Sequence, residues 1–320
     1  MKKMKEIMIM LLLSLSFTCI AQETTSEISG IVLDANSSLA GVYITAIHVP
    51  TGTKYLTTTR KDGRYNLPNL KVGGPYTVTA SFVGYNSNRQ SDIMLNLGQT
   101  FEQNFKLVES DNTKLSEVTV KATRSKVFNS SRTGSQEIIS RSTIEQLPTI
   151  SRSWKDMIKL VPAQNNSSFG GISSQLNNLT IDGANFNNSF GLSDAIGGQT
   201  GAQPISLDAI EQIQVNVSPY DVKYGGFNGA GINTVTRSGK NQTFGSVYDY
   251  IKSKDLQGYK VGDVSLAKQD FNYNLFGFTA GGAIIKNKLF FFINGETEKK
   301  VSPGTSWQAS NSTNTPNGVN

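Results

Sequence analysis

Apolar and polar residues alternate along most of this chain, with the period of two that is typical of β-strands. Between residues 26 and 108 the alternating runs SGIVLD, GVYITAI and YTVTASF are short, and turn segments such as VPTGT and RKDGR separate them. Short strands at regular spacing, with Gly, Pro and Asp between them, favour a small β-sandwich. We therefore expect residues 22–108 to form an amino-terminal sandwich domain.

The next segment, residues 109–126, is polar and is predicted to be a linker. Within it, KLSEVTVKA (residues 114–122) alternates again. The pattern leaves two interpretations open: a linker run or last strand of the sandwich, or an extended segment that adds as a strand to a partner's sheet edge. Under either interpretation, Leu115, Glu117 and Thr119 alternate along the segment with Ser116, Val118 and Val120.

Two short helices are predicted at the start of the following region, residues 127–240. STIEQLP begins with a capping box of Ser142 and Glu145, and SRSWKDMIKLVP begins with Ser153 and Asp156. The second segment carries an apolar stripe with spacing i, i+3, i+4, i+7, which predicts a buried face: Trp154, Met157, Ile158 and Val161.

Strands follow these helices. In IQVNV, the apolar residues Ile213, Val215 and Val217 share one face, and the polar residues take the other. The segment YGGFNGAGINTVTRSG then holds four closely spaced glycines, Gly225, Gly226, Gly229 and Gly231. A phosphate-binding loop requires a helix after the glycines, whereas β-branched alternation follows here. The glycines are therefore expected to permit tight turns and close approach of one backbone to another.

From residue 241 onward the alternating runs are longer and rich in aromatic residues. FGSVYDYI, FNYNLFGFTAGGAI and KLFFFINGE have the length and alternation of transmembrane β-strands, and Lys286, Asn287 and Lys288 predict a tight turn between the last two. A closed barrel needs at least about eight strands. Residues 241–320 are therefore expected to be the first strands of an antiparallel transmembrane barrel, in a fragment or a truncated product.

The first 21 residues are predicted to be a secretory signal peptide cleaved after Ala21. They combine the basic start MKKMKE, the apolar run IMIMLLLSLSF and a small residue at the end. Cys19, the single cysteine, lies inside this leader, so lipidation at Cys19 is the alternative processing and a disulfide framework is excluded after ordinary cleavage. The formal charge of +6 is scattered rather than clustered, which argues against a nucleic-acid partner.

Catalytic chemistry is disfavoured by the residues present. His48 is the single histidine of the chain, and no GxSxG elbow accompanies it. A structural role for His48 is favoured over metal ligation, because no cysteine accompanies it. We therefore predict no catalytic residues, no metal and no cofactor.

Several motifs together resemble the TonB-dependent outer-membrane receptors. IEQIQVNVSPYDVKYGGFNGAGINTVTRSG is similar to the end of their plug domain, LTIDGANFNN contains their IDG motif (Ile181, Asp182, Gly183), and LSEVTV stands where their TonB box is found. The segment from SGIVLD to SFVGY resembles a carboxypeptidase regulatory-like domain, a transthyretin-like or immunoglobulin-like sandwich. FTAGGAIIKNKLFFFINGE resembles the first barrel hairpin of the Oar-like branch, and the whole order resembles SusC-like and Oar-like receptors.

The resemblance implies a mainly β protein of the outer membrane, with the sandwich (22–108) and the small α/β plug (127–240) facing the periplasm. The box Leu115–Val120 would bind TonB, which is energised by an inner-membrane complex and would pull the plug aside or partly unfold it. Further implied partners are outer-membrane lipid, a lipoprotein lid, and an extracellular glycan, peptide or chelate ligand. The family's precedent thus predicts energy-coupled import of a nutrient.

One alternative function stays open from the sequence. The chain could be a secreted or surface-attached sandwich that binds carbohydrate or protein without transport. The tyrosines of residues 26–108 are dispersed and form no evident aromatic platform for a sugar. A carboxypeptidase is excluded at this stage, because the sequence contains the motifs of the regulatory-like accessory domain and no others of that enzyme.

Overall fold

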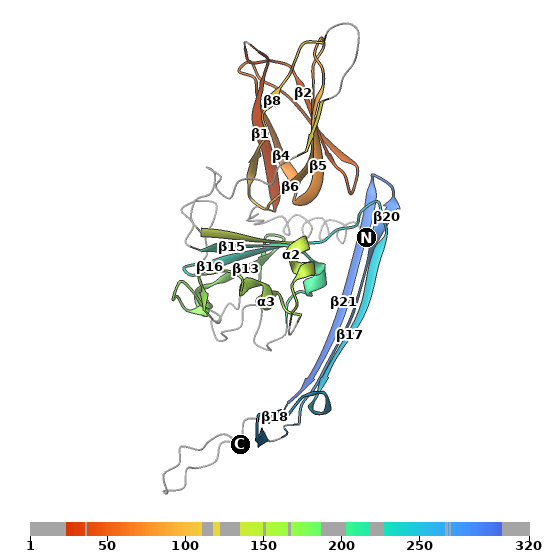
Figure 1. The fold of residues 1–320 in the computed structure, drawn as a ribbon. Coiled ribbons are helices and arrows are strands. Elements are labelled where there is room, and N and C mark those ends of the chain that lie inside the picture. Colours follow the sequence, from red (N-terminus) through yellow and green to blue (C-terminus); the bar gives the residue numbers. More distant parts are fainter. Residues whose placement is uncertain are drawn as a thin grey trace, which may run out of the picture. The chain divides into compact units, whose positions relative to one another are not determined.

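The computed structural model describes residues 24–35, 37–110, 118–121, 135–149, 152–165, 168–186, 203–217, 227–265, 268 and 270–302. The predicted signal peptide lies outside these residues. The chain divides into two compact units: residues 1–243 with 282–291, and residues 244–281 with 292–320. Strands dominate both units, as the sequence predicts (Figure 1).

A β-sandwich forms the amino-terminal part of the first unit, which confirms the prediction (Figure 1). One sheet contains β4 (Arg64–Lys71), β1 (Thr25–Leu33), β7 (Thr100–Glu102) and β8 (Phe105–Lys106). The other has the order β3 (Thr53–Thr58), β2 (Tyr43–His48), β5 (Gly73–Ser81), β6 (Asn88–Leu95) and β9 (Val118–Lys121). The sandwich thus includes a strand from the predicted linker.

The core of the sandwich follows from the period of two. In β2, Ile44, Ala46 and His48 are buried, and the residues between them are exposed or half-buried. Ile28 of β1 and Tyr76 of β5 are fully buried in the same cluster. Burying one such large apolar side chain stabilises the fold by about 1.5–3 kcal/mol.

A small mixed sheet, which we call the mixed-sheet domain, forms the rest of the first unit. Its order is β10 (Ser135–Ser140), β15 (Ile210–Val217), β16 (Ala230–Thr236), β13 (Asn178–Ile181) and β14 (Ala184–Asn185). The β13–β16 pair is parallel, and the other pairs are antiparallel. Shorter elements are α2 (Arg141–Gln146), α3 (Trp154–Ile158), β11 (Gln164–Asn165), β12 (Ser168–Phe169), η1 (Ser174–Leu176) and η2 (Leu207–Ala209).

Both faces of β15 are buried. Ile213 and Val215 lie in the apolar core of the domain together with residues of α2 and α3, as the alternation predicts. The polar face is also covered: Gln212 Oε1 accepts from the Leu97 backbone N–H at 2.8 Å, and Gln214 Nε2 donates to the Leu97 carbonyl at 2.9 Å. Because these amides find backbone partners, their burial carries little penalty.

The two helices form where the sequence predicts them, with one correction. The cap of α2 is Ser140, whose Oγ accepts from the Thr143 N–H, rather than Ser142. The helix starts earlier because it follows β10 directly. Ser153 caps α3 as expected, and its apolar stripe is buried. Among the residues described, no helix is long and apolar enough to cross a bilayer.

The long strands that the sequence predicts form one three-stranded sheet, most of which belongs to the second unit, whereas residues 282–291 belong to the first. β17 (Phe244–Ser253), β20 (Asn272–Ile285) and β21 (Leu289–Val301) form one sheet in the order β17-β20-β21. The turn after β20 contains Asn287 with φ of 61°, and Lys288 N–H donates to the Ile285 carbonyl at 3.1 Å. The remaining elements are η3 (Lys254–Leu256), β18 (Lys260–Val261) and β19 (Val264–Ser265).

This three-stranded sheet has an apolar face and a more polar face. Val247 stands opposite Phe278, and the two side chains are 73% and 40% exposed. On the other face, Ser246 and Thr279 share a hydrogen bond of 2.7 Å, and Tyr248 donates to Glu296 at 2.7 Å. An exposed apolar face with polar residues behind it is typical of strands that face lipid.

Candidate functional site

The strand β9 contains the second half of the predicted TonB box. Val118, Thr119 and Val120 belong to β9, whereas Leu115, Ser116 and Glu117 lie outside the described residues. The strand pairs in parallel with β6, with Val118 opposite Asn88 and Lys121 opposite Ser91. It is the terminal strand of the five-stranded sheet. The structure thus places this segment as a last strand of the sandwich, one of the interpretations that the sequence left open.

The chain before β9 is held beside the beginning of β6. Glu109 forms an isolated bridge with Tyr85, and Ser110 N–H donates to the Gly84 carbonyl at 2.8 Å. The chain next enters the described part at Val118, opposite Asn88. Both ends of the connection between Ser110 and Val118 therefore lie near the turn that joins β5 to β6.

The IDG motif forms the turn between β13 and β14. Ile181 ends β13, and Asp182 and Gly183 have φ values of 49° and 82°. Asp182 Oδ1 accepts from the Thr236 N–H at 2.9 Å, and Oδ2 accepts from the Thr236 hydroxyl at 2.6 Å. Asp182 thus ties this turn to the end of β16, and its short polar side chain suits a left-handed backbone.

Two of the four predicted glycines lie in the described part, Gly229 and Gly231, whereas Gly225 and Gly226 lie outside it. A Cβ at Gly231 would overlap the ring of Phe227, and one at Gly229 would overlap Asn177 Oδ1. That oxygen accepts from the Ala230 N–H at 2.9 Å. Both glycines therefore permit close approach, while neither has the positive φ of a glycine-specific turn.

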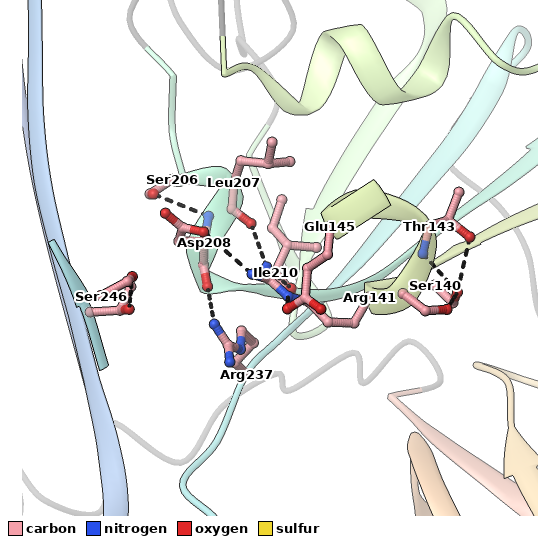
Figure 2. A network of polar contacts seen from close by, with 12 residues as sticks. Ser140, Arg141, Thr143, Glu145, Ser206, Leu207, Asp208, Ile210, Arg237 and Ser246 are labelled. Atoms are coloured by element: carbon pink, nitrogen blue, oxygen red, sulfur yellow. Dashed lines mark hydrogen bonds and ion pairs between the residues drawn. The ribbon is translucent and has the colours of Figure 1, made fainter. Parts of the chain in front are cut away.

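A cluster of ionic contacts around Asp208 joins distant parts of the mixed-sheet domain (Figure 2). Asp208 is 8% exposed and forms ion pairs with Arg141 (3.3 Å) and Arg152. Its backbone carbonyl accepts from Arg237 at 3.2 Å. Burial, followed by the charge of Arg141, lowers the pKa of Arg237, and nearby carboxylates oppose that shift.

Arg141 connects this Asp208 cluster to the start of α2. Its Nη1 donates to the carbonyls of Leu207 and Ile210, each at 3.2 Å, and its Nε pairs with Glu145 at 2.7 Å (Figure 2). Arg141 is the first residue of α2 and follows the last residue of β10. The cluster therefore fixes the point where β10 ends.

Sequence reasoning did not find this cluster. Its members are separated by tens of residues, and no short motif connects them. Burial of Asp208 depends on the tertiary fold and leaves no local pattern.

The sandwich has a polar hollow of about 480 Å³ on the sheet formed by β4, β1 and β7. Asn66, Ser29 and Glu102 stand side by side across the three strands. Arg60 and Arg64 also line the hollow. These groups can donate and accept hydrogen bonds, so the hollow suits a polar ligand.

His48 has a structural environment, as the sequence favours. Its Nδ1 is 2.7 Å from the Thr51 hydroxyl, and its ring lies 4.9 Å from that of Tyr76. Burial and the charges of Lys71 and Lys240 lower the pKa of His48 to about 4. Among the described residues, no cluster of His, Cys, Asp and Glu could hold a metal ion.

Comparison with known proteins gives matches at both ends of the chain. The carboxypeptidase regulatory-like domain matches residues 27–108, and an outer membrane beta barrel domain matches residues 235–318. Over 84% of its length, the chain is 29% identical to the TonB-dependent transporter Oar of Myxococcus xanthus. The match covers 26% of that relative, so this chain spans about a quarter of its length.

Among solved structures, the siderophore receptor PirA from Acinetobacter baumannii is similar to 52% of this chain, with 22% identity and a TM-score of 0.41. The similarity covers 25% of PirA.

The two domain matches and the similarity to Oar support the predicted resemblance to TonB-dependent receptors of the outer membrane. They support the predicted family and its outer-membrane location, and the described sheets confirm the mainly β fold.

Proposed function

We propose that this chain provides the periplasmic sandwich, the plug and the first barrel strands of a receptor that imports an extracellular nutrient with energy from TonB. In this proposal the mixed-sheet domain is the plug. Its mixed sheet, the IDG turn and the closely approached Gly229 and Gly231 support that assignment. The outer membrane has no ATP supply, so the energy must arrive mechanically.

The observation that carries the proposal is the position of an extended segment between the two domains. Val118–Val120 adopt strand geometry, the conformation that a segment needs to add to a partner's sheet edge. Among the described residues, the mixed-sheet domain begins at β10. A pull on Leu115–Val120 would therefore reach the described part of the plug first at Ser135.

The position of β10 suits such a pull. Among the described strands it lies at the edge of its sheet and pairs with β15, from Ser135 opposite Val217 to Ser140 opposite Gln212. Force applied before Ser135 would separate these pairs one after another until it reached Arg141. The Asp208 cluster would then resist further unfolding, because breaking a buried ion pair is costly.

Binding of a synthetic Leu115–Val120 peptide to the carboxy-terminal domain of TonB from the same organism tests the proposal. We expect saturable binding by calorimetry. A peptide with Val118→Pro should lose it, because proline removes a backbone donor from the added strand. A scrambled peptide of the same composition is the matched control. Absence of binding, or equal binding by the proline peptide, would contradict the proposal.

A second candidate function rests on the polar hollow of the sandwich. Guanidinium, amide and carboxylate groups line it, which favours a hydroxylated ligand such as a glycan. A glycan array with the full chain tests this candidate. Binding that disappears in Glu102→Gln and persists in Glu109→Gln, outside the hollow, would support it, and silence of the array would leave the hollow without this function.

A further inference from the structure

The polar face of β15 is an interaction surface that the proposed function does not use. Gln212 and Gln214 of this face hold both backbone polar groups of Leu97, which lies in the turn between β6 and β7 of the sandwich. Gln212 Nε2 also donates to Asn96 Oδ1 at 2.9 Å. Side chains thus give this turn the hydrogen bonds that a neighbouring strand would otherwise provide.

The turn that contains Leu97 is built by the sandwich itself. Ser26 Oγ donates to the Asn96 carbonyl at 2.5 Å, and Gly98 N–H donates to the Thr25 carbonyl at 3.0 Å. These bonds join the turn to β1, and none of them involves the mixed-sheet domain. The turn therefore keeps its shape whether or not it contacts β15.

The receiving side chains are likewise held by their own domain. Gln214 Oε1 accepts from Asn233 Nδ2 at 3.1 Å, and Asn233 Oδ1 accepts from the Thr180 hydroxyl at 2.6 Å. This network directs Gln214 Nε2 toward Leu97. Because the face carries amides rather than apolar side chains, water can replace Leu97 at little cost when the face is uncovered.

A charged contact lies beside this surface and has the same polar character. Lys71 Nζ donates to Ser238 Oγ. Burial lowers the pKa of Lys71, and the charge of Glu211 on β15 opposes that shift. A Cβ at Gly73 would lie 3.1 Å from Glu211 Oε1, so this carboxylate lies against the start of β5. Polar interfaces between domains of one chain permit relative motion of the domains.

We propose that the polar face of β15 is a reversible docking surface for the sandwich, which leaves and returns as a folded body. Leu97, Gln212 and Gln214 belong to neither of the apolar clusters that form the two domain cores. Undocking therefore breaks a few hydrogen bonds and leaves both cores intact. The inference goes beyond the proposed function, because it requires neither TonB nor a nutrient.

Hydrogen exchange of the Leu97 amide in the full chain, at increasing urea concentration, tests the proposal. We expect protection of at least about tenfold over the unfolded chain, from docking at Gln212. Its exchange should depend far less on urea than that of Val78 in the sandwich or Val215 in the mixed sheet, because undocking exposes little surface. Equal urea dependence at Leu97 and either core amide would overturn the proposal, since the contact would then open by unfolding alone. Lack of protection at Leu97 would overturn the docked form.

A variant of the receiving face gives the second test. Gln212→Ala removes the acceptor of the Leu97 N–H and should accelerate its exchange about tenfold, with Val78 and Val215 unchanged. Gln136→Ala, on the neighbouring β10 and opposite Asn216, is the matched control and should leave Leu97 unchanged. If Gln212→Ala accelerated Val215 as much as Leu97, the glutamine would be a structural part of the mixed sheet and the proposal would fail. It would also fail if the exchange of Leu97 did not respond.

Discussion

The strands β9 and β10 stand on either side of residues 122–134, and both lie at the edge of a sheet, yet they are held very differently. β9 makes four parallel pairs with β6, whereas β10 makes six antiparallel pairs with β15. β10 also buries Ile139 in an apolar core and leads directly into Arg141 of the Asp208 cluster. The chain therefore joins a weakly held edge strand to a firmly held one.

This difference suits a protein that is pulled at the segment between its domains. A partner can remove a short terminal strand by exchange, without disturbing a core. The strand that leads into the proposed plug must instead resist until force arrives. Under the proposed function, TonB recognition would fall to the segment of β9 and resistance to force would fall to β10.

The largest effect is expected from Asp208→Asn, which removes the anchor at the end of β10. Two guanidinium groups would lose their buried carboxylate, at a cost of about 3–5 kcal/mol in the free energy of unfolding. Urea unfolding followed by fluorescence of the buried Trp154, in a Trp307→Phe background, measures it. Glu145→Gln removes the exposed partner of the same Arg141 and should cost below about 1 kcal/mol. Equal losses would contradict the anchor.

A similar loss is expected when β10 loses its core contact. Ile139 is 2% exposed, so Ile139→Ala should lower the free energy of unfolding of the mixed-sheet domain by about 2–5 kcal/mol. Ile138 is half-buried on the opposite face and provides the control. The same fluorescence measurement applies. An Ile138→Ala variant that is as unstable as Ile139→Ala would disprove the assignment of the buried face.

Acid should weaken the sandwich that carries β9. The pKa of His48 is about 4 in the fold and 6.5 in the unfolded chain, so the unfolded state binds more protons between these values. The contribution of His48 to the free energy of unfolding at neutral pH is therefore lost as the pH falls from 6.5 to 4. The loss amounts to up to about 3 kcal/mol. Urea unfolding monitored by hydrogen exchange of β2 measures the loss. His48→Gln should flatten this part of the pH profile, and an unchanged profile would refute the prediction.

The smallest effect is expected at the opposite edge of the mixed sheet. Asp182→Ala removes two acceptors for Thr236 and should cost about 1–2 kcal/mol. Asp182→Asn retains an acceptor and a residue type that tolerates positive φ, so it should cost less. Thermal unfolding compares the two. If either variant increased hydrogen exchange in β10, this result would contradict the view that β10 is anchored locally, at Arg141.

Local patterns in the sequence predicted much of the fold. The period of two located the strands of the sandwich and the three long strands, and the spacing of Trp154, Met157 and Ile158 located a buried helix face. The cap at Ser140 was missed, since the end of β10 and the start of α2 are contiguous and propensity does not resolve such a boundary.

Long-range contacts were less predictable. The alternation of Leu115–Val120 indicated an extended segment, but no local pattern could indicate its partner β6, because strand pairing depends on tertiary structure. Burial of both faces of β15 was likewise not evident, since Gln212 and Gln214 are polar. The Asp208 cluster depends on arginines far apart in sequence.

Hydrogen exchange of the full chain, with and without the carboxy-terminal domain of TonB, tests the central claim most directly. Alone, amides of β9 should exchange by local opening and those of β10 much more slowly, with the mixed-sheet domain. On addition of TonB, we predict protection of Leu115–Val120. Unchanged exchange at Leu115–Val120 in the presence of saturating TonB would contradict the account.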